Sequence, residues 1–194
     1  MGEHEVKRIE APLLAKTVNA LRAGMRVAIS GTLLTARDAA HKRLVETVER
    51  GETLPVDLKR QVLYYTGPSP APLGLVIGSA GPTTSGRMDP FTPKLLALGV
   101  RGMIGKGQRS PEVVEAIKNY RAVYFVAIGG AGALLSQHIV ASQVLAYPEL
   151  GPEAIRRLEV EDFPAIVVID CRGGNLYERG LQEWKGRASA PGPG

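Results

Sequence analysis

The sequence predicts an α/β fold, because short apolar runs typical of strands alternate with segments of helical periodicity. Two of these runs, Gly74–Gly78 and Ala165–Ile169, are almost wholly apolar, as expected of strands that are buried on both faces of a sheet. The first 80 residues are richer in expected strands than the rest. The chain has 194 residues, which is enough for a core of its own, and we expect residues 1–187 to form a single domain.

The individual elements follow from apolar patterning and from turn residues at their ends. Strands are expected at 5–10 (an edge strand), 26–30, 61–65, 74–78, 102–104, 123–128 and 165–169. Helices are expected at 17–22, 35–50, 92–98 and 111–120, and within 131–144. Residues 188–194 are rich in Ala, Pro, Gly and Ser, which favours a disordered tail.

The helix over 35–50 has the clearest pattern. Thr35 is its expected N-cap, Asp38 stands three residues later as in a shortened capping box, and Gly51 ends it. Its apolar face has a four-residue spacing and consists of Ala36, Ala40, Leu44 and Val48. Ser110 followed by Pro111 is an equally favoured start for the helix over 111–120.

Composition and charge exclude several classes of protein. The net charge is +5, but the cations are scattered and aromatic residues make up only 5%, which argues against nucleic-acid binding. No apolar run reaches the ~20 residues that a membrane-spanning helix needs. The single cysteine, Cys171, excludes an internal disulfide, fits a reducing cytoplasm and is expected to be an inert buried thiol. The three histidines lie far apart and offer no metal-ligand spacing, so no metal site is expected in this chain.

Two segments that contain an arginine indicate a binding site. Arg37 lies within Ser30–Asp38 and Arg87 within Gly81–Asp89; each segment follows an apolar run and passes through small hydroxyl residues towards a helix start. Such a junction presents free N–H groups, and a guanidinium beside it can hold a carboxylate through two parallel hydrogen bonds. Lys106, between two glycines after the apolar run 102–104, adds a third cation. Together these segments predict a site for a small polyanion.

Each of these residues also has a plainer interpretation, and the residues alone leave both open. Arg37 could form a surface ion pair, and Lys106 could be an ordinary loop lysine. Helix capping or ion pairing with neighbours would be enough to explain the acidic and hydroxyl residues of the two segments: Asp38, Asp89, Thr83 and Thr84. His41 is more simply a structural or surface histidine, and Gly129–Gly132 a tight turn rather than a phosphate loop.

Taken together, the motifs resemble the β subunit of two-subunit class I fumarases. The matching stretches run in family order through nearly the whole chain: SGTLLTARDAAHKRL (30–44), GPTTSGRMD (81–89), GKG (105–107), IGGAGAL (128–134) and EVEDFPAIVVID (159–170). L-tartrate dehydratase β subunits share the scheme. Gly86 and Ala40 favour the fumarase branch.

The resemblance implies a swivelling β/β/α domain with a mixed sheet and flanking helices, and the reversible hydration of fumarate to L-malate. In that family pattern Arg37, Arg87 and Lys106 bind the carboxylates of the substrate. Thr83 also contacts the substrate and is the base that removes the C3 proton of malate.

The resemblance also implies a [4Fe–4S] cluster, which one cysteine cannot bind. We therefore expect a cluster-bearing α subunit as partner, a hetero-oligomer such as α2β2, an active site at the interface and a cytoplasmic location. A dehydratase acting on L-tartrate or another 2-hydroxy-dicarboxylate, and a non-catalytic anion-binding module, stay as alternatives.

Overall fold

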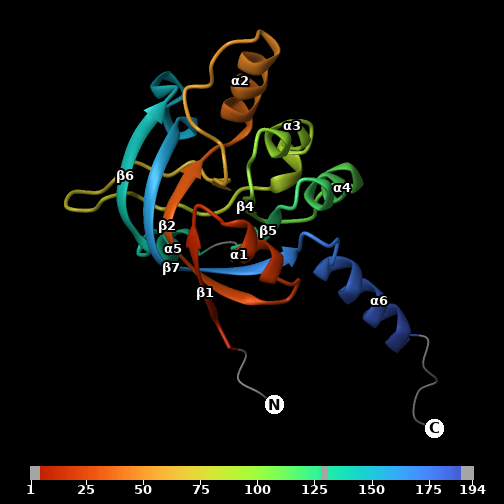
Figure 1. Cartoon of the computed structure of the whole chain (residues 1–194). Helices are drawn as coiled ribbons and strands as arrows, with labels where there is room; N and C mark the ends of the chain where they lie inside the picture. Colours follow the sequence, from red (N-terminus) through yellow and green to blue (C-terminus); the bar gives the residue numbers. More distant parts are fainter. Residues whose placement is uncertain (1–4, 128–130, 189–194) are drawn as a thin grey trace.

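The computed structural model describes residues 5–127 and 131–188, and its centre is a mixed seven-stranded sheet (Figure 1). The strands are β1 (Lys7–Ala11), β2 (Arg26–Thr35), β3 (Val62–Tyr64), β4 (Gly102–Gly105), β5 (Val123–Val126), β6 (Ile139–Ala146) and β7 (Ile155–Ile169). The helices are α1 (Ala15–Ala20), α2 (Asp38–Glu49), α3 (Thr92–Ala97), α4 (Pro111–Asn119), α5 (Gly132–Ser136) and α6 (Leu176–Ala188), with 3₁₀ helices η1 (Ser85–Met88) and η2 (Pro148–Glu153). This confirms the expected α/β class, mixed sheet and flanking helices.

The sheet has a parallel part and an antiparallel part. Its order is β1-β2-β3-β4-β5-β7-β6; β1 to β5 run parallel, and β7 is antiparallel to its neighbours β5 and β6. The 15-residue β7 also pairs antiparallel with β2, so the strands from β2 round to β7 close into a ring. β1 lies at one edge, as the sequence predicts for residues 5–10.

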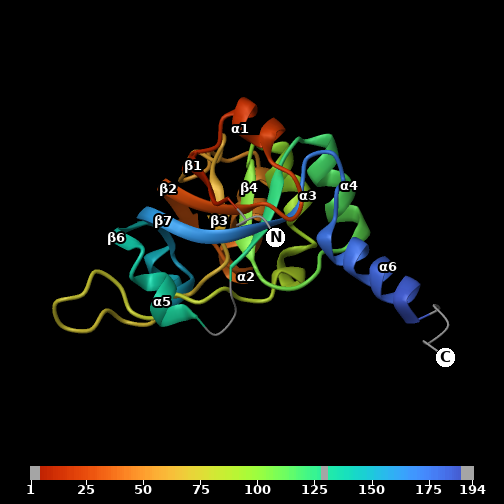
Figure 2. The ribbon, with the colours of Figure 1, turned by 90° about the horizontal axis from the view of Figure 1, so that it is seen from below.

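Two apolar cores occupy the two faces of this ring. Successive strand residues point to opposite faces, so Leu33 joins one core while Leu34 joins the other, and Val62 and Leu63 divide in the same way. The second core is covered by α2, α3 and α4 (Figure 2), whose apolar side chains include Leu44. No helix within the described residues is long and apolar enough to cross a membrane.

The expected strand over Gly74–Gly78 is wrong. These residues lie in a loop between β3 and η1, pair with no strand among the described residues, and leave Leu75 62% and Val76 49% exposed. Prolines at 68, 70 and 72 remove backbone donors just upstream, and Gly74 has φ +79°, which strand geometry does not allow. The second arginine segment therefore follows a loop and enters a short 3₁₀ helix.

The expected N-cap Thr35 is also wrong. β2 continues to Thr35, whose Oγ1 donates to the Ala154 carbonyl at 3.0 Å and accepts from the Arg156 N–H at 2.9 Å. Helix α2 begins at Asp38, with Arg37 as N-cap, and Gly51 ends it at φ +71° as expected. The cap of α4 is confirmed, because the Ser110 side chain accepts a hydrogen bond from the Val113 N–H.

The second half of the chain holds elements that the sequence did not reveal. Residues 131–144 contain the expected helix (α5) but also most of β6, and the strand expected at 165–169 is the end of the longer β7. Helix α6 was not expected, and Ala188, placed in the predicted tail, is its last residue. The rest of that tail, 189–194, and the first two residues of the Gly129–Gly132 turn lie outside the described residues.

Candidate functional site

The candidate site lies at the carboxyl ends of three neighbouring parallel strands. The register aligns Thr35 of β2 with Tyr64 of β3, and Tyr64 with Ile104 of β4. Arg37 and Lys106 each stand two residues beyond this row. Since the carboxyl ends of parallel strands meet at one edge of a sheet, the fold brings both cations to the same edge, where α/β proteins commonly bind ligands.

Two arginines from different elements converge there on one carboxylate. Arg87, in η1, donates from Nε to Asp38 Oδ1 at 2.8 Å. Arg37 Nε lies 3.9 Å from Asp38 Oδ2, too far for a hydrogen bond, and both atoms are buried without a hydrogen-bond partner. Arg37 also pairs with Glu153 of η2 at 3.5 Å. The Arg87 side chain is 51% exposed, and Nε is its one donor with a hydrogen-bond partner among the described residues.

Thr83 and Lys106 are held together through the main chain. The Thr83 N–H donates to the Tyr65 carbonyl at 2.7 Å, just beyond the end of β3. The Lys106 N–H donates to the Thr83 carbonyl at 3.2 Å, and the Ser85 N–H donates to the Lys106 carbonyl at 2.9 Å. Thr83 is half-buried and Lys106 is exposed. The segment from Thr83 to Arg87 therefore runs along the end of β4. It contains two of the predicted site residues, Thr83 and Arg87, and its main chain bonds to a third, Lys106.

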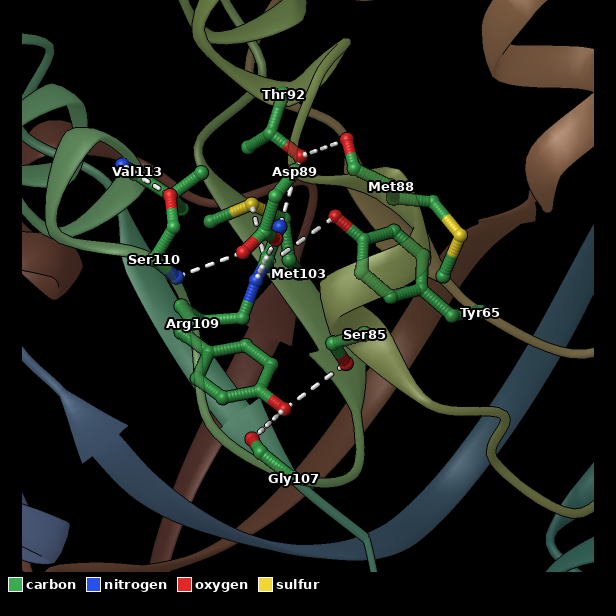
Figure 3. Close-up of polar contacts among 11 residues, drawn as sticks. Tyr65, Ser85, Met88, Asp89, Thr92, Met103, Gly107, Arg109, Ser110 and Val113 are labelled. Carbon is green, nitrogen blue, oxygen red and sulfur yellow. Dashed lines mark hydrogen bonds and ion pairs between the residues drawn. The ribbon is translucent and has the colours of Figure 1, made fainter.

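A buried arginine, Arg109, bonds to the residues that directly follow this segment (Figure 3). Arg109 is 8% exposed and donates from Nε to Asp89 Oδ1 at 2.7 Å and from Nη2 to Thr92 Oγ1 at 2.8 Å. The second oxygen of Asp89 accepts the Ser110 N–H at 2.6 Å. Burial lowers the pKa of Arg109, but Tyr65 and then Asp89 raise it by more, so the net pKa is raised and the guanidinium stays charged. The pair fixes the end of the turn that carries Arg87.

Tyr124 ties the same turn to the lysine loop. Its hydroxyl lies 2.9 Å from Ser85 Oγ and 2.8 Å from the Gly107 carbonyl, so it can accept from the serine and donate to the carbonyl. Burial raises the pKa of this phenol, which keeps the donor in place. A Cβ at Gly105 would collide with Ser85 Oγ, so the close approach of η1 to β4 requires glycine there.

His41 has a structural role, in agreement with the simpler of its two interpretations from the sequence. It is fully buried on α2 with its ring edge-on to Tyr65, 5.2 Å between centroids. Its Nδ1 lies 2.9 Å from the Arg37 carbonyl, which assigns the proton of the neutral ring to Nδ1. Burial lowers its pKa to about 4. His41 therefore fixes the main chain at Arg37 and stays neutral at pH 7.

All four predicted site residues (Arg37, Thr83, Arg87 and Lys106) thus belong to one edge of the sheet. The structure also shows the contacts that the plainer interpretations expect. Arg37 forms ion pairs, and Asp38 and Asp89 pair with neighbouring arginines. Thr84 is the N-cap of η1, although its side chain makes no cap hydrogen bond. The sequence missed the support by Arg109 and Tyr124. An arginine carries no sequence signal of burial, since charged side chains are rarely buried.

The described residues do not fit an iron–sulfur cluster. Cys171 is buried, and its Sγ lies 3.6 Å from the Val18 carbonyl, on the side of the sheet packed by α1. No group of three His, Cys, Asp or Glu within residues 5–127 and 131–188 could hold a metal ion.

Comparison with known proteins identifies the family. The family described as "Fumarase C-terminus" matches residues 2–180. The aerobic class I fumarate hydratase of Escherichia coli (strain K12) is 39% identical over 184 residues, which cover 92% of this chain and 34% of that protein. Fumarate hydratase 2 of Leishmania major is 42% identical over 160 residues, covering 81% and 28%. The chain therefore spans about a third of the length of these fumarate hydratases.

A shorter relative matches along most of its own length. This protein of Methanocaldococcus jannaschii, named as an L(+)-tartrate dehydratase subunit beta, is 37% identical over 172 residues, which cover 86% of this chain and 88% of the relative. The family match extends over nearly all of the described residues and includes the whole candidate site. The chain belongs to the fumarase C-terminus family, whose members include class I fumarate hydratases and L-tartrate dehydratase β subunits.

Proposed function

We propose that the chain is the β subunit of a hydro-lyase that reversibly hydrates fumarate to L-malate. The observation that carries this proposal is the alignment of β2, β3 and β4, whose carboxyl ends gather Arg37, Thr83 and Lys106 at one edge. Arg87 joins them through Asp38. A dicarboxylate carries two anionic groups, and this edge offers three cations from three separate segments.

In this proposal the cations bind the two carboxylates of the substrate. Arg87 uses Nε for Asp38 and its side chain is half exposed, so its two terminal nitrogens can take a carboxylate through two parallel hydrogen bonds. The Nε of Arg37, also close to Asp38, has no hydrogen-bond partner of its own. Lys106, whose N–H bonds to the Thr83 carbonyl, adds a third positive charge. Asp38 holds the two arginines side by side, so little reorganisation is needed when substrate binds.

Thr83 is the proposed base for the C3 proton of malate. A threonine hydroxyl is a very weak acid, and nearby cations are needed to favour its alkoxide. The same cations stabilise the carbanion-like charge that spreads onto the neighbouring carboxylate as the proton leaves. Main-chain bonds on both sides of Thr83 hold its position relative to Lys106 and Tyr65.

The proposal requires a partner, because this chain has one cysteine. A cluster-bearing α subunit would supply the [4Fe–4S] cluster, a Lewis acid for the C2 hydroxyl, together with the catalytic acid. An α2β2 assembly, a site at the interface of the subunits and the swivelling β/β/α domain type belong to this proposal. The relatives support it, because the fumarate hydratases are about three times as long as the matched region.

L-Tartrate dehydration is the second candidate function. The relative named for that activity is matched over 88% of its own length, the proportion expected of two equivalent subunits. The same cations could bind either dicarboxylate, so the substrate has to be measured.

The test is co-expression with the cluster-bearing chain of the same organism, anaerobic purification and assay of fumarate, L-malate and L-tartrate. We expect fumarate hydration that needs both chains and is lost in air. Turnover of L-tartrate but not of fumarate would assign the second function to the chain. Fumarate hydration by this chain alone would contradict the partner requirement, and no turnover by the pair would contradict the proposal.

A further inference from the structure

Two long stretches of the sequence contain no charged residue. Neither Gln61–Gly86 nor Ala122–Pro148 includes an Asp, Glu, Lys or Arg, although 22% of the chain is charged. The stretches include the buried strands β3 and β5, where this is expected. They also include surface segments: the loop 66–82, helix α5 and strand β6. Surfaces that face water normally carry charges, so these segments are unusual.

Large apolar side chains on these segments face solvent. The side chain of Leu73 is fully exposed, and that of Leu134 on α5 is 63% exposed. We define the uncharged face by its exposed apolar members: Leu73, Leu75, Val76, Leu134, Val140 and Val144. Depletion of charge combined with exposed apolar residues is typical of a surface that another protein covers.

The segments of this face adjoin one another. The Ala80 N–H at the base of the loop donates to the Gly132 carbonyl at the start of α5, at 3.2 Å. Val76 of the loop and Ser142 of β6 line one cavity of about 290 Å³. In Figures 1 and 2 the loop, in yellow, projects from the body beside β6 and α5.

The loop is fixed at its neck. Thr66 Oγ1 donates to the Gly81 carbonyl at 2.9 Å, and the Ser69 N–H donates to the Ser79 carbonyl at 3.0 Å. Between these ties the tip extends away from the body, and two residues beyond Gly81 the chain reaches Thr83. The neck of the loop that carries Leu73, Leu75 and Val76 therefore leads directly into the candidate site.

We propose that the uncharged face is the docking surface for the cluster-bearing polypeptide, an inference that rests on the proposed function. About two thirds of the polypeptide in the fumarate hydratases matched by this chain lies outside the matched region, and the site needs groups from it. A partner seated on this face, whose loop leads to Thr83, brings those groups to the substrate. A second copy of this chain would cover the face without supplying the several thiolates that a cluster needs, since each copy has one cysteine.

The test measures partner binding by a charged variant of the loop tip. The partner is the chain of the same organism that resembles the part of the Escherichia coli fumarate hydratase outside the matched region. L73D/L75D places two carboxylates on side chains that pack little, so circular dichroism and thermal unfolding of the variant should match wild type. The matched control is L181D, on the 55% exposed Leu181 of α6, which projects from another side of the body (Figure 1).

We expect L73D/L75D to weaken binding on the order of 100-fold, because an interface charge without a partner is costly, and L181D to change it less than about twofold. Equal binding by L73D/L75D and wild type would overturn the inference, as would a wild-type chain that does not bind this partner. A wild-type dimer that L73D/L75D makes monomeric, with partner binding unchanged, would assign the face to a second copy and also overturn it.

Failure of the proposed function gives a different result. Thr83 contributes to no part of the uncharged face, so T83A should bind the partner as wild type does. A complex that forms through the face but turns over neither fumarate nor L-tartrate would leave the docking surface standing and contradict the activity.

Discussion

Arg109 and Arg87 lie on either side of the same short turn, and their surroundings are opposite. Arg109 is buried and its guanidinium is saturated by Asp89, Thr92 and the rings of Tyr65 and Tyr124. Arg87 makes one close ion pair, with Asp38, and is half exposed. A saturated cation has no donors left for a ligand, whereas an exposed one has several. Arg109 therefore holds the turn in shape, whereas Arg87 keeps donors that a ligand can use.

The largest expected effect is on stability, from loss of the buried cation. R109M would leave the Asp89 carboxylate buried without its partner, and we expect the free energy of unfolding to fall by about 3–5 kcal/mol in urea titrations. The matched control R87M, at the exposed end of the turn, should cost less than about 1 kcal/mol. Similar losses for both variants would remove the distinction between the two arginines.

His41 should make the stability of the fold depend on pH. Its folded-state pKa is about 4 against an ordinary 6.5, so the unfolded chain binds the proton more readily. Stability is full above pH 6.5 and is lost as the pH falls towards 4, by about 3 kcal/mol from this group. Urea unfolding at pH 7 and at pH 4 should show this loss in wild type and not in H41Q. Equal pH dependence in the two proteins would contradict the assignment.

Arg87 should affect substrate affinity more than turnover. R87K keeps the charge but loses the planar fork, and we expect KM for the dicarboxylate to rise about 10–100-fold in the assembled enzyme, with a smaller change in kcat. Steady-state kinetics beside wild type provides the measurement. An unchanged KM would show that Arg87 only balances the charge of Asp38.

Tyr124 should give the smallest effect. Y124F removes the hydroxyl between Ser85 and Gly107, and about 1 kcal/mol of unfolding free energy should be lost in urea titrations. Y120F, at a 40% exposed tyrosine at the end of α4, is the matched control and should be neutral. A neutral Y124F would mean that the hydroxyl does not hold the lysine loop to η1.

The sequence predicts the part of the fold that forms the site. The strands expected at 26–30, 61–65 and 102–104 are present, and parallel pairing with aligned carboxyl ends follows from the α/β pattern. That is enough to bring Arg37 and Lys106 to one edge. Apolar composition alone does not distinguish a buried strand from an exposed apolar loop at 74–78, because both have the same run of apolar residues. The support from Arg109 depends on contacts between residues 20 and 44 positions apart, which no local pattern encodes.

Thr83 gives the sharpest test of the proposal that this edge of the sheet takes part in the chemistry. In the assembled enzyme T83A should lower kcat by about 100–10,000-fold with a modest change in KM, since a base acts mainly in the transition state. T84A, at the exposed neighbour, should remain close to wild type. Full activity of T83A in a correctly assembled complex would contradict the account.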